Sequence, residues 1–109
     1  MALFMTQFGY TSEAWAALAK KPEDRAQALR SLIEKFGGHL REMYYCFGDY
    51  DGLAIFDAPD DQTAAAVAVA AVGPGHVRTI RTTPLFTMQE AMAIMAKAGK
   101  VSYAGPSGK

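Results

Sequence analysis

The chain has 109 residues, half of them hydrophobic, and its 11 basic and 11 acidic side chains leave no net charge. This length and composition predict one globular domain. The lack of excess positive charge argues against nucleic acid or an anionic membrane as a partner. A domain of this size leaves much of its surface exposed, and a net charge near zero gives little electrostatic repulsion between copies. We therefore expect a homodimer or a higher homo-oligomer.

Cysteine content and the N-terminal residues indicate the compartment. The single cysteine, Cys46, cannot form an intrachain disulfide, which favours a reducing environment. The first residues have no basic opening and no small-residue cleavage site, so no signal peptide is expected. The apolar run Ala64–Val72 is too short to span a membrane. We therefore expect a cytoplasmic protein without a membrane partner.

The first third of the chain reads as a strand followed by two helices. Residues Ala2–Tyr10 form an expected strand that is mostly apolar on both faces. Glu13–Lys20 is an expected helix that Thr11 or Ser12 can cap. Pro22–Phe36 is a second expected helix, with apolar residues on one side at helical spacing.

A hairpin occupies the middle of the chain. Strand patterns at His39–Phe47 and Leu53–Ala58 flank a turn of glycines and aspartates. An uncharged, alanine-rich helix follows over Gln62–Val72, and its small side chains predict close packing on more than one side. The last strand covers Val77–Phe86, and Pro84 within it indicates an edge position.

The final helix begins at a capping box. Thr87-Met88-Gln89-Glu90 has the pattern of two reciprocal caps, and a stripe of apolar residues follows as far as Ala98. We expect residues 1–101 to form the domain and residues 102–109 to form a flexible C-terminal tail.

The element order predicts an α+β, ferredoxin-like βαββαβ fold with an added C-terminal helix. Its four-stranded antiparallel sheet would carry helices on one face and leave the other bare. We expect Leu3 and Met5 to face the helices, and Phe4, Phe8 and Tyr10 to line the bare face. Two bare faces packed together would form a dimeric α/β barrel with an enclosed interior.

Four short motifs resemble the signature of the GYD-domain family. They are Gly37-Gly38, Gly48-Asp49-Tyr50-Asp51, Asp57-Ala58-Pro59-Asp60 and Val77-Arg78-Thr79. Their order and spacing cover nearly the whole chain, from about Met5 to Ala98. The resemblance implies the ferredoxin-like fold and the dimeric α/β barrel, and it implies no settled activity.

Two looser resemblances suggest kinds of activity. The hairpin turn is similar to one in the effector-binding domain of Lrp/AsnC regulators, where it lies near an amino-acid site between subunits. The chain lacks the preceding helix-turn-helix pattern, so a stand-alone sensor module is the expected counterpart. The chain is also similar in fold to the antibiotic-biosynthesis monooxygenases, which oxidise aromatic substrates without a cofactor, but it shares no residue motif with them.

Aromatic and polar residues around the hairpin are the candidate ligand-binding residues. They are Phe8, Tyr10, Trp15, Tyr44, Cys46 and Asp51. Such residues suit a partly apolar pocket, and they suit a core or a dimer contact equally well. For Asp51 the main interpretation is that its carboxylate accepts N–H bonds within its own turn. The alternative is that it binds a ligand amine or acts as a general base.

His39 and Asp51 are the candidate catalytic bases. Alternation along the strand predicts that His39 faces away from Tyr44 unless a β-bulge intervenes. Arg25, Arg78 and Arg81 could each hold a carboxylate, or Arg25 could only pair with its acidic neighbours. Arg78 and Arg81 should point to opposite faces of their strand, so at most one of them would line the barrel. About three suitable ligands for a metal cannot be assembled, and no cofactor motif is present, so we expect neither a metal nor a cofactor.

The sequence favours a small-molecule-binding module over two alternatives. The ligand would be small and apolar, aromatic or amino-acid-like, enclosed near the open sheet faces of a homo-oligomer. A cofactor-independent enzyme, such as a monooxygenase, isomerase or lyase, is the first alternative. A purely structural oligomerisation domain is the second. Binding is preferred because the titratable residues are few and do not converge.

Overall fold

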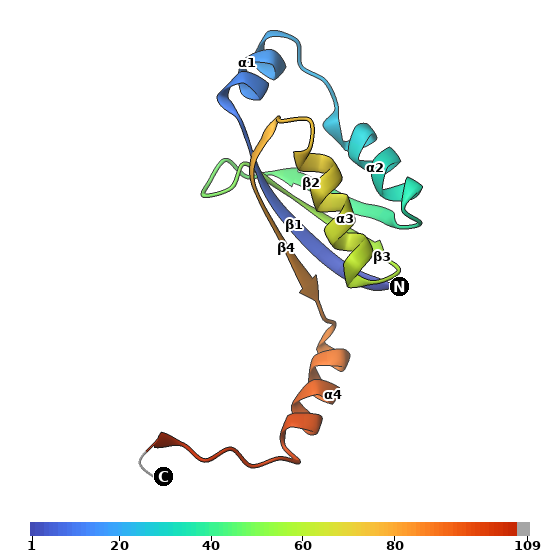
Figure 1. Cartoon of the computed structure of the whole chain (residues 1–109), viewed down its shortest axis with the longest axis vertical. Helices are drawn as coiled ribbons and strands as arrows, with labels where there is room; N and C mark the ends of the chain where they lie inside the picture. The colour runs from blue at the N-terminus through green and yellow to red at the C-terminus, as the bar shows by residue number, and fades with distance from the viewer. Residues whose placement is uncertain (107–109) are drawn as a thin grey trace.

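A computed structural model describes residues 1–106 and has the expected order of elements (Figure 1). In chain order they are β1 (Ala2–Tyr10), α1 (Ser12–Lys20), α2 (Arg25–Lys35), β2 (His39–Tyr45), β3 (Gly52–Ala58), α3 (Asp61–Val72), β4 (Val77–Leu85) and α4 (Met88–Ala98). The strands form one antiparallel sheet in the order β2-β3-β1-β4. This confirms the α+β, ferredoxin-like prediction.

Capping side chains set the helix starts. Thr11 caps α1, as predicted. The second helix starts at Arg25 rather than at Pro22, because the Asp24 carboxylate accepts a hydrogen bond from the backbone N of Ala26 at 2.9 Å. An aspartate in this position satisfies one of the free N–H groups of the first turn, so the helix begins directly after it.

Two strands are shorter than predicted. β2 ends at Tyr45, because the chain turns sharply at Phe47, whose φ is 54°. β4 ends at Leu85 and lies at the edge of the sheet, as Pro84 predicted. A proline is tolerated there because an edge strand has N–H groups without a partner strand.

The prediction of which β1 residues line the bare face was wrong. Phe4, Phe8 and Tyr10 are buried beneath the helices, and alternation therefore places Leu3 and Met5 on the open face. Both sides of this strand are apolar, so the pattern alone could not choose between them. On the helix side the aromatic side chains pack in two core clusters, with Ile33 of α2 in one and Ala14 of α1 in the other.

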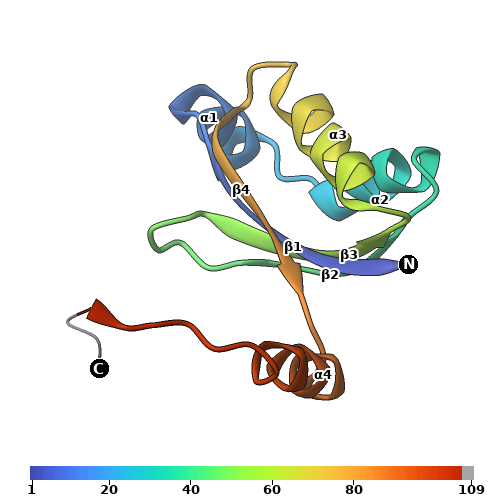
Figure 2. The same cartoon turned by 60° about the horizontal axis from the view of Figure 1, so that its bottom comes forward.

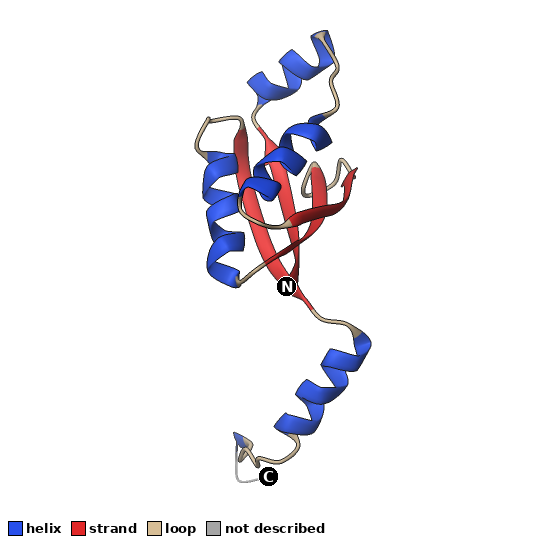
Figure 3. Cartoon of the chain, turned by 90° about the vertical axis from the view of Figure 1, so that its right-hand side faces the viewer, coloured by secondary structure: helices blue, strands red, loops and turns tan. Residues whose placement is uncertain are grey.

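The core consists of two separate clusters of buried residues. The larger joins the sheet to α2 and α3 and contains Phe4, Ile33, Phe56, Ala58, Ala64 and Val67. The smaller joins the sheet to α1 and contains Phe8, Tyr10 and Ala14. Figure 3 shows α1 near one end of the sheet, apart from α3. The separation leaves space between the clusters.

Helix α4 takes no part in this core. The capping box is confirmed: the Thr87 hydroxyl accepts from Glu90 N at 3.0 Å, and the Glu90 carboxylate accepts from Thr87 N at 2.8 Å. No residue of α4 is buried, and Figure 2 shows the helix across the sheet from α1–α3. The radius of gyration is 17.7 Å, whereas a compact domain of this length has about 13 Å. The C-terminal part is therefore an extended arm.

The predicted tail is described as far as Pro106, and residues 107–109 lie outside the described part. Over residues 1–106, the helices are too short or too polar to cross a membrane.

Candidate ligand-binding pocket

A pocket of about 630 Å³ lies between the helices and the sheet. Small-molecule sites typically have volumes in this range. Phe8, Met43 and Ile80 line it from the sheet, while Leu18 of α1 and Leu29 of α2 line it from the helices. Most of the wall is therefore apolar.

The pocket exists because the helices present short side chains to it. Ala14 and Ala17 of α1 and Ala68 and Ala71 of α3 all line the space. Protein interiors are otherwise filled to the density of organic crystals, so a group of methyl side chains leaves room that larger residues would occupy. The alanine-rich helix packs into the core through Ala64 and Val67, but Val67 and three alanines after it also border the pocket. This differs from the close packing on more than one side that we predicted.

Apart from Tyr10, four residues with charged or titratable side chains line the pocket. Lys21, Glu23 and Arg25 come from the segment around the α1–α2 connection, and His76 precedes β4. The Arg25 Nη1 and Glu23 Oε1 atoms are 3.2 Å apart, and both side chains are partly exposed to solvent. We call these four residues the charged rim. Its basic side chains outnumber its single carboxylate, so it favours an anionic group.

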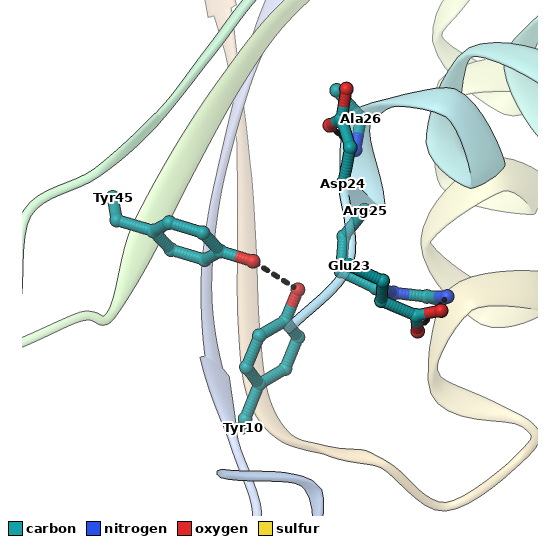
Figure 4. Close-up of polar contacts among 6 residues, drawn as sticks. All are labelled: Tyr10, Glu23, Asp24, Arg25, Ala26 and Tyr45. Atoms are coloured by element: carbon teal, nitrogen blue, oxygen red, sulfur yellow. Dashed lines mark hydrogen bonds and ion pairs between the residues drawn. The ribbon is translucent and has the colours of Figure 1, made fainter. Parts of the chain in front are cut away.

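Two tyrosine hydroxyls meet beside the charged rim. The Oη atoms of Tyr10 and Tyr45 are 3.3 Å apart and face the Glu23–Ala26 segment (Figure 4). Burial raises the pKa of Tyr10 well above its ordinary value, the hydrogen bond to Tyr45 raises it further, and Arg25 lowers it. A tyrosine hydroxyl is protonated at neutral pH, and the raised pKa extends this to higher pH, so the Tyr10 hydroxyl can donate a hydrogen bond to a bound molecule.

An aromatic cluster supports this end of the pocket. The Trp15 ring centroid lies 5.1 Å from that of Tyr10, 5.6 Å from that of Tyr45 and 5.7 Å from that of Phe47. Edge-to-face and tilted contacts of this kind stabilise aromatic groups beyond the area that they bury. Trp15 thus fixes Tyr10 from behind and does not itself line the pocket.

Asp51 joins the hairpin to β1 and α1. Its Oδ2 atom accepts hydrogen bonds from Tyr10 N at 2.8 Å and Trp15 Nε1 at 2.9 Å, and Arg78 Nη2 lies 3.8 Å away. Its own N–H donates to the carbonyl of Phe8 at 2.8 Å. The hydrogen bonds from Trp15 and Tyr10 lower the pKa of Asp51. Our main interpretation placed these donors in the turn of Asp51 itself, and it was wrong in this respect, because the donors belong to β1 and α1.

Tyr44 and Cys46 lie outside this pocket. Tyr44 pairs with Leu53 on the open face of the sheet, where it is 55% exposed, and its hydroxyl contacts Glu42. Cys46 is exposed after the end of β2, and its sulfur lies 3.2 Å from the carbonyl oxygen of Tyr50. Neither side chain can contribute to a ligand held beneath the helices.

A β-bulge places His39 on the same face as Tyr44. The register of β2 shifts directly after Leu40, and His39 pairs with Asp57. The Asp57 carboxylate lies 2.9 Å from His39 Nδ1 and accepts a hydrogen bond from Arg41 Nε at 2.8 Å. Burial alone would raise the pKa of Asp57, but the contacts with His39 and Arg41 outweigh it and lower the pKa. His39 is thus held by its contact with Asp57, away from the pocket.

The structure brings only part of the predicted set together. Phe8 and Tyr10 line the pocket, and Trp15 and Asp51 support it from outside. Sequence reasoning gave no functional role to Lys21 or His76, and it did not predict the alanine walls. The sequence could not indicate Lys21 and His76 as neighbours of one pocket. They lie in the α1–α2 and α3–β4 connections, which are far apart in the chain, and no sequence pattern shows that both connections border the same space. Within residues 1–106, no group of three or more His, Cys, Asp and Glu side chains could hold a metal ion.

Comparisons with known proteins identify a family and a fold. A family model described as GYD domain matches residues 4–95. A search of curated proteins found no match. Among solved structures, the chain is similar to the one in the crystal structure of MtbAldR, with a TM-score of 0.57 and 14% sequence identity. The similarity covers 79% of this chain and 52% of that chain, so this chain spans about half the length of that protein. At this identity the likeness shows a shared fold.

Proposed function

The chain belongs to the GYD domain family, and from its pocket we propose that it is a small-molecule-binding module. The observation that carries the proposal is the space of about 630 Å³ with apolar walls and a charged rim. We place the ligand between the sheet and the helices, and not near the open faces, because Phe8 and Tyr10 face the helix side.

The preferred ligand is an apolar or aromatic molecule with one carboxylate. The apolar walls favour a hydrocarbon or ring, which gains free energy when it leaves water. Arg25 supplies a guanidinium, whose planar fork matches a carboxylate, and the protonated Tyr10 hydroxyl lies beside it. A ligand carboxylate would take the place of Glu23 as the partner of Arg25.

Fluorescence titration tests this proposal directly. Trp15 is the only tryptophan and packs on Tyr10, so its emission should respond to a molecule in the pocket. The probes are octanoate and phenylacetate, each compared with the alcohol of the same carbon skeleton. Both acids should bind and raise the melting temperature, and each should bind more tightly than its alcohol.

Matched substitutions locate the binding site. Ala71→Phe should fill the pocket and abolish binding of every probe, whereas Ala65→Phe, on the same helix but outside the pocket, should not. Arg25→Gln should weaken binding of the acids by about tenfold to a hundredfold, since it removes a charged hydrogen bond. Arg25→Gln should not change the binding of the alcohols. The control, Arg30→Gln on the same helix, should change the binding of neither the acids nor the alcohols. Equal binding to wild type and Ala71→Phe would contradict the proposal.

Catalysis is not part of the proposed function. Neither candidate base lines the pocket: His39 pairs with Asp57, and Asp51 accepts hydrogen bonds from Tyr10 and Trp15. A general base must lie within hydrogen-bond reach of the proton that it removes. The geometry of these two residues therefore favours structural roles.

We also propose that the module is a homodimer whose open sheet faces pack together. This face carries five half-buried apolar residues, which are Leu3, Met5, Leu53, Ile55 and Leu85. An apolar patch of this kind on a soluble protein marks an interaction surface. Ile55→Glu should convert the dimer to a monomer in light scattering. The control, Val69→Glu, changes an exposed residue on the helix side and should have no effect. A dimer that survives Ile55→Glu would contradict this arrangement.

A further inference from the structure

The C-terminal helix α4 presents an apolar face that nothing in the described chain covers. Met88, Ala91, Met92, Ile94 and Met95 lie on one side of the helix, and Met92 and Met95 are each 68% exposed. The helix is extended from the body on an arm, and the described chain reaches 60 Å along its long axis. A stripe of this kind normally faces a protein core.

An isolated helix of this length is not stable in water by its own propensity. α4 has 11 residues, and helices shorter than about 12–15 residues are marginal without tertiary contacts. The capping box at Thr87 and Glu90 satisfies the first N–H groups, but it does not replace a packed face. The helix therefore requires a surface to pack against.

The position of the arm selects that surface. Figure 2 shows α4 on the side of the sheet opposite α1–α3, which is the side of the open face. A second copy that covers the open face must occupy the same side. Apolar residues also follow one another along the chain here, from Leu85 on the open face through the exposed Phe86 to Met88 of α4. Its several methionines suit an interface, since their flexible side chains adapt to the opposing surface.

We propose that α4 is an exchanged arm, whose apolar stripe packs on a second copy of this chain. In a twofold dimer each subunit would give one arm and receive one, so the open face and the two arms form one interface. This inference rests on the homodimer proposed above, and it is independent of the ligand pocket.

Hydrogen exchange at two protein concentrations tests the arm in the full chain. The amides of α4 should be protected when the protein is dimeric and should exchange rapidly when dilution gives monomer. Protection that is equal at both concentrations would overturn the proposal, because it would mean that the arm packs on its own subunit. A dimer with unprotected α4 amides would overturn it as well.

A matched pair of double variants tests the apolar stripe. Met92→Glu with Met95→Glu places two charges in the stripe, and it should raise the dimer dissociation constant by about tenfold or more. Gln89→Glu with Ala93→Glu adds two glutamates on the other side of the helix and should leave that constant within about threefold. An unchanged dissociation constant in the Met92/Met95 variant would refute the arm alone. A monomeric wild type would refute both the arm and the homodimer. The ligand pocket is tested separately, by the fluorescence titration with the acid and alcohol probes.

Discussion

Removal of the Asp51 carboxylate should destabilise the domain although the residue lies in a surface hairpin. In Asp51→Ala, Tyr10 N and Trp15 Nε1 lose their acceptor at once. A hydrogen bond to a charged group contributes about 1.5–3 kcal/mol, and a donor left unsatisfied adds a cost of about 1–3 kcal/mol. Because two bonds that share one oxygen are not additive, we expect a loss of about 3 kcal/mol. This corresponds to a fall in melting temperature of about 10–20 °C.

The loss can be measured because the variant should remain folded. A domain of this length is stable by about 5–15 kcal/mol. Urea unfolding, followed by the fluorescence of Trp15 and by circular dichroism at one fixed protein concentration, gives the free energy of unfolding. Asp49→Ala is the matched control, since Asp49 is exposed in the same turn, and its cost should stay below about 0.5 kcal/mol.

Two further measurements separate charge from hydrogen bonding at this position. Asp51→Asn keeps one acceptor oxygen but not the charge, so it should cost about half as much as Asp51→Ala. The pKa of Asp51 is lowered in the folded state, so its stabilisation is complete above its ordinary value of about 3.9 and is lost as the pH falls through the folded value. The difference between wild type and Asp51→Asn should therefore close below about pH 4. The structural role is refuted if Asp51→Ala is no less stable than Asp49→Ala.

Three other substitutions have defined outcomes. Asp57→Asn should cost about 1–3 kcal/mol in urea unfolding at pH 7, because the buried carboxylate bonds to His39 and a neighbouring arginine. Its lowered pKa means that this deficit should shrink as the pH falls below about 4, and a deficit independent of pH would contradict the assignment. Gly52→Ala should lower the melting temperature, since an added Cβ would lie 2.5 Å from Phe8 Cζ and 2.9 Å from the backbone oxygen of Tyr44. An unchanged melting temperature would show that the Phe8 ring can move aside. Thr87→Ala removes one half of the capping box and should destabilise α4 by about 1 kcal/mol, seen as faster amide exchange in α4 only.

Most of the secondary structure could be predicted from short sequence patterns, because each depends on residues close together in the chain. The hairpin follows from strand patterns around a turn of glycines and aspartates, and the capping box marks the start of α4 through contacts only three residues apart. Pro84 indicated an edge strand because it lacks an N–H group. The family motifs lie in the turns and at the strand ends of this fold, and the family model matches residues 4–95. Where predictions erred by a few residues, as at the start of α2, a neighbouring side chain supplied a better cap.

Only the tertiary structure decided which side of each strand faces which partner. β1 is apolar on both sides, so its sequence does not show whether Phe8 or Met5 faces the helices. The wrong choice turns every side chain of the strand to the opposite face, and the structure places Phe8 on the helix side. The pocket depends on that choice and on the distance of α1 from α3. Asp51 finds its partners 36 and 41 residues away, in α1 and β1, and no local pattern encodes a hydrogen bond over that separation. Sequence periodicity thus determined the elements, while the packing of distant segments determined the site.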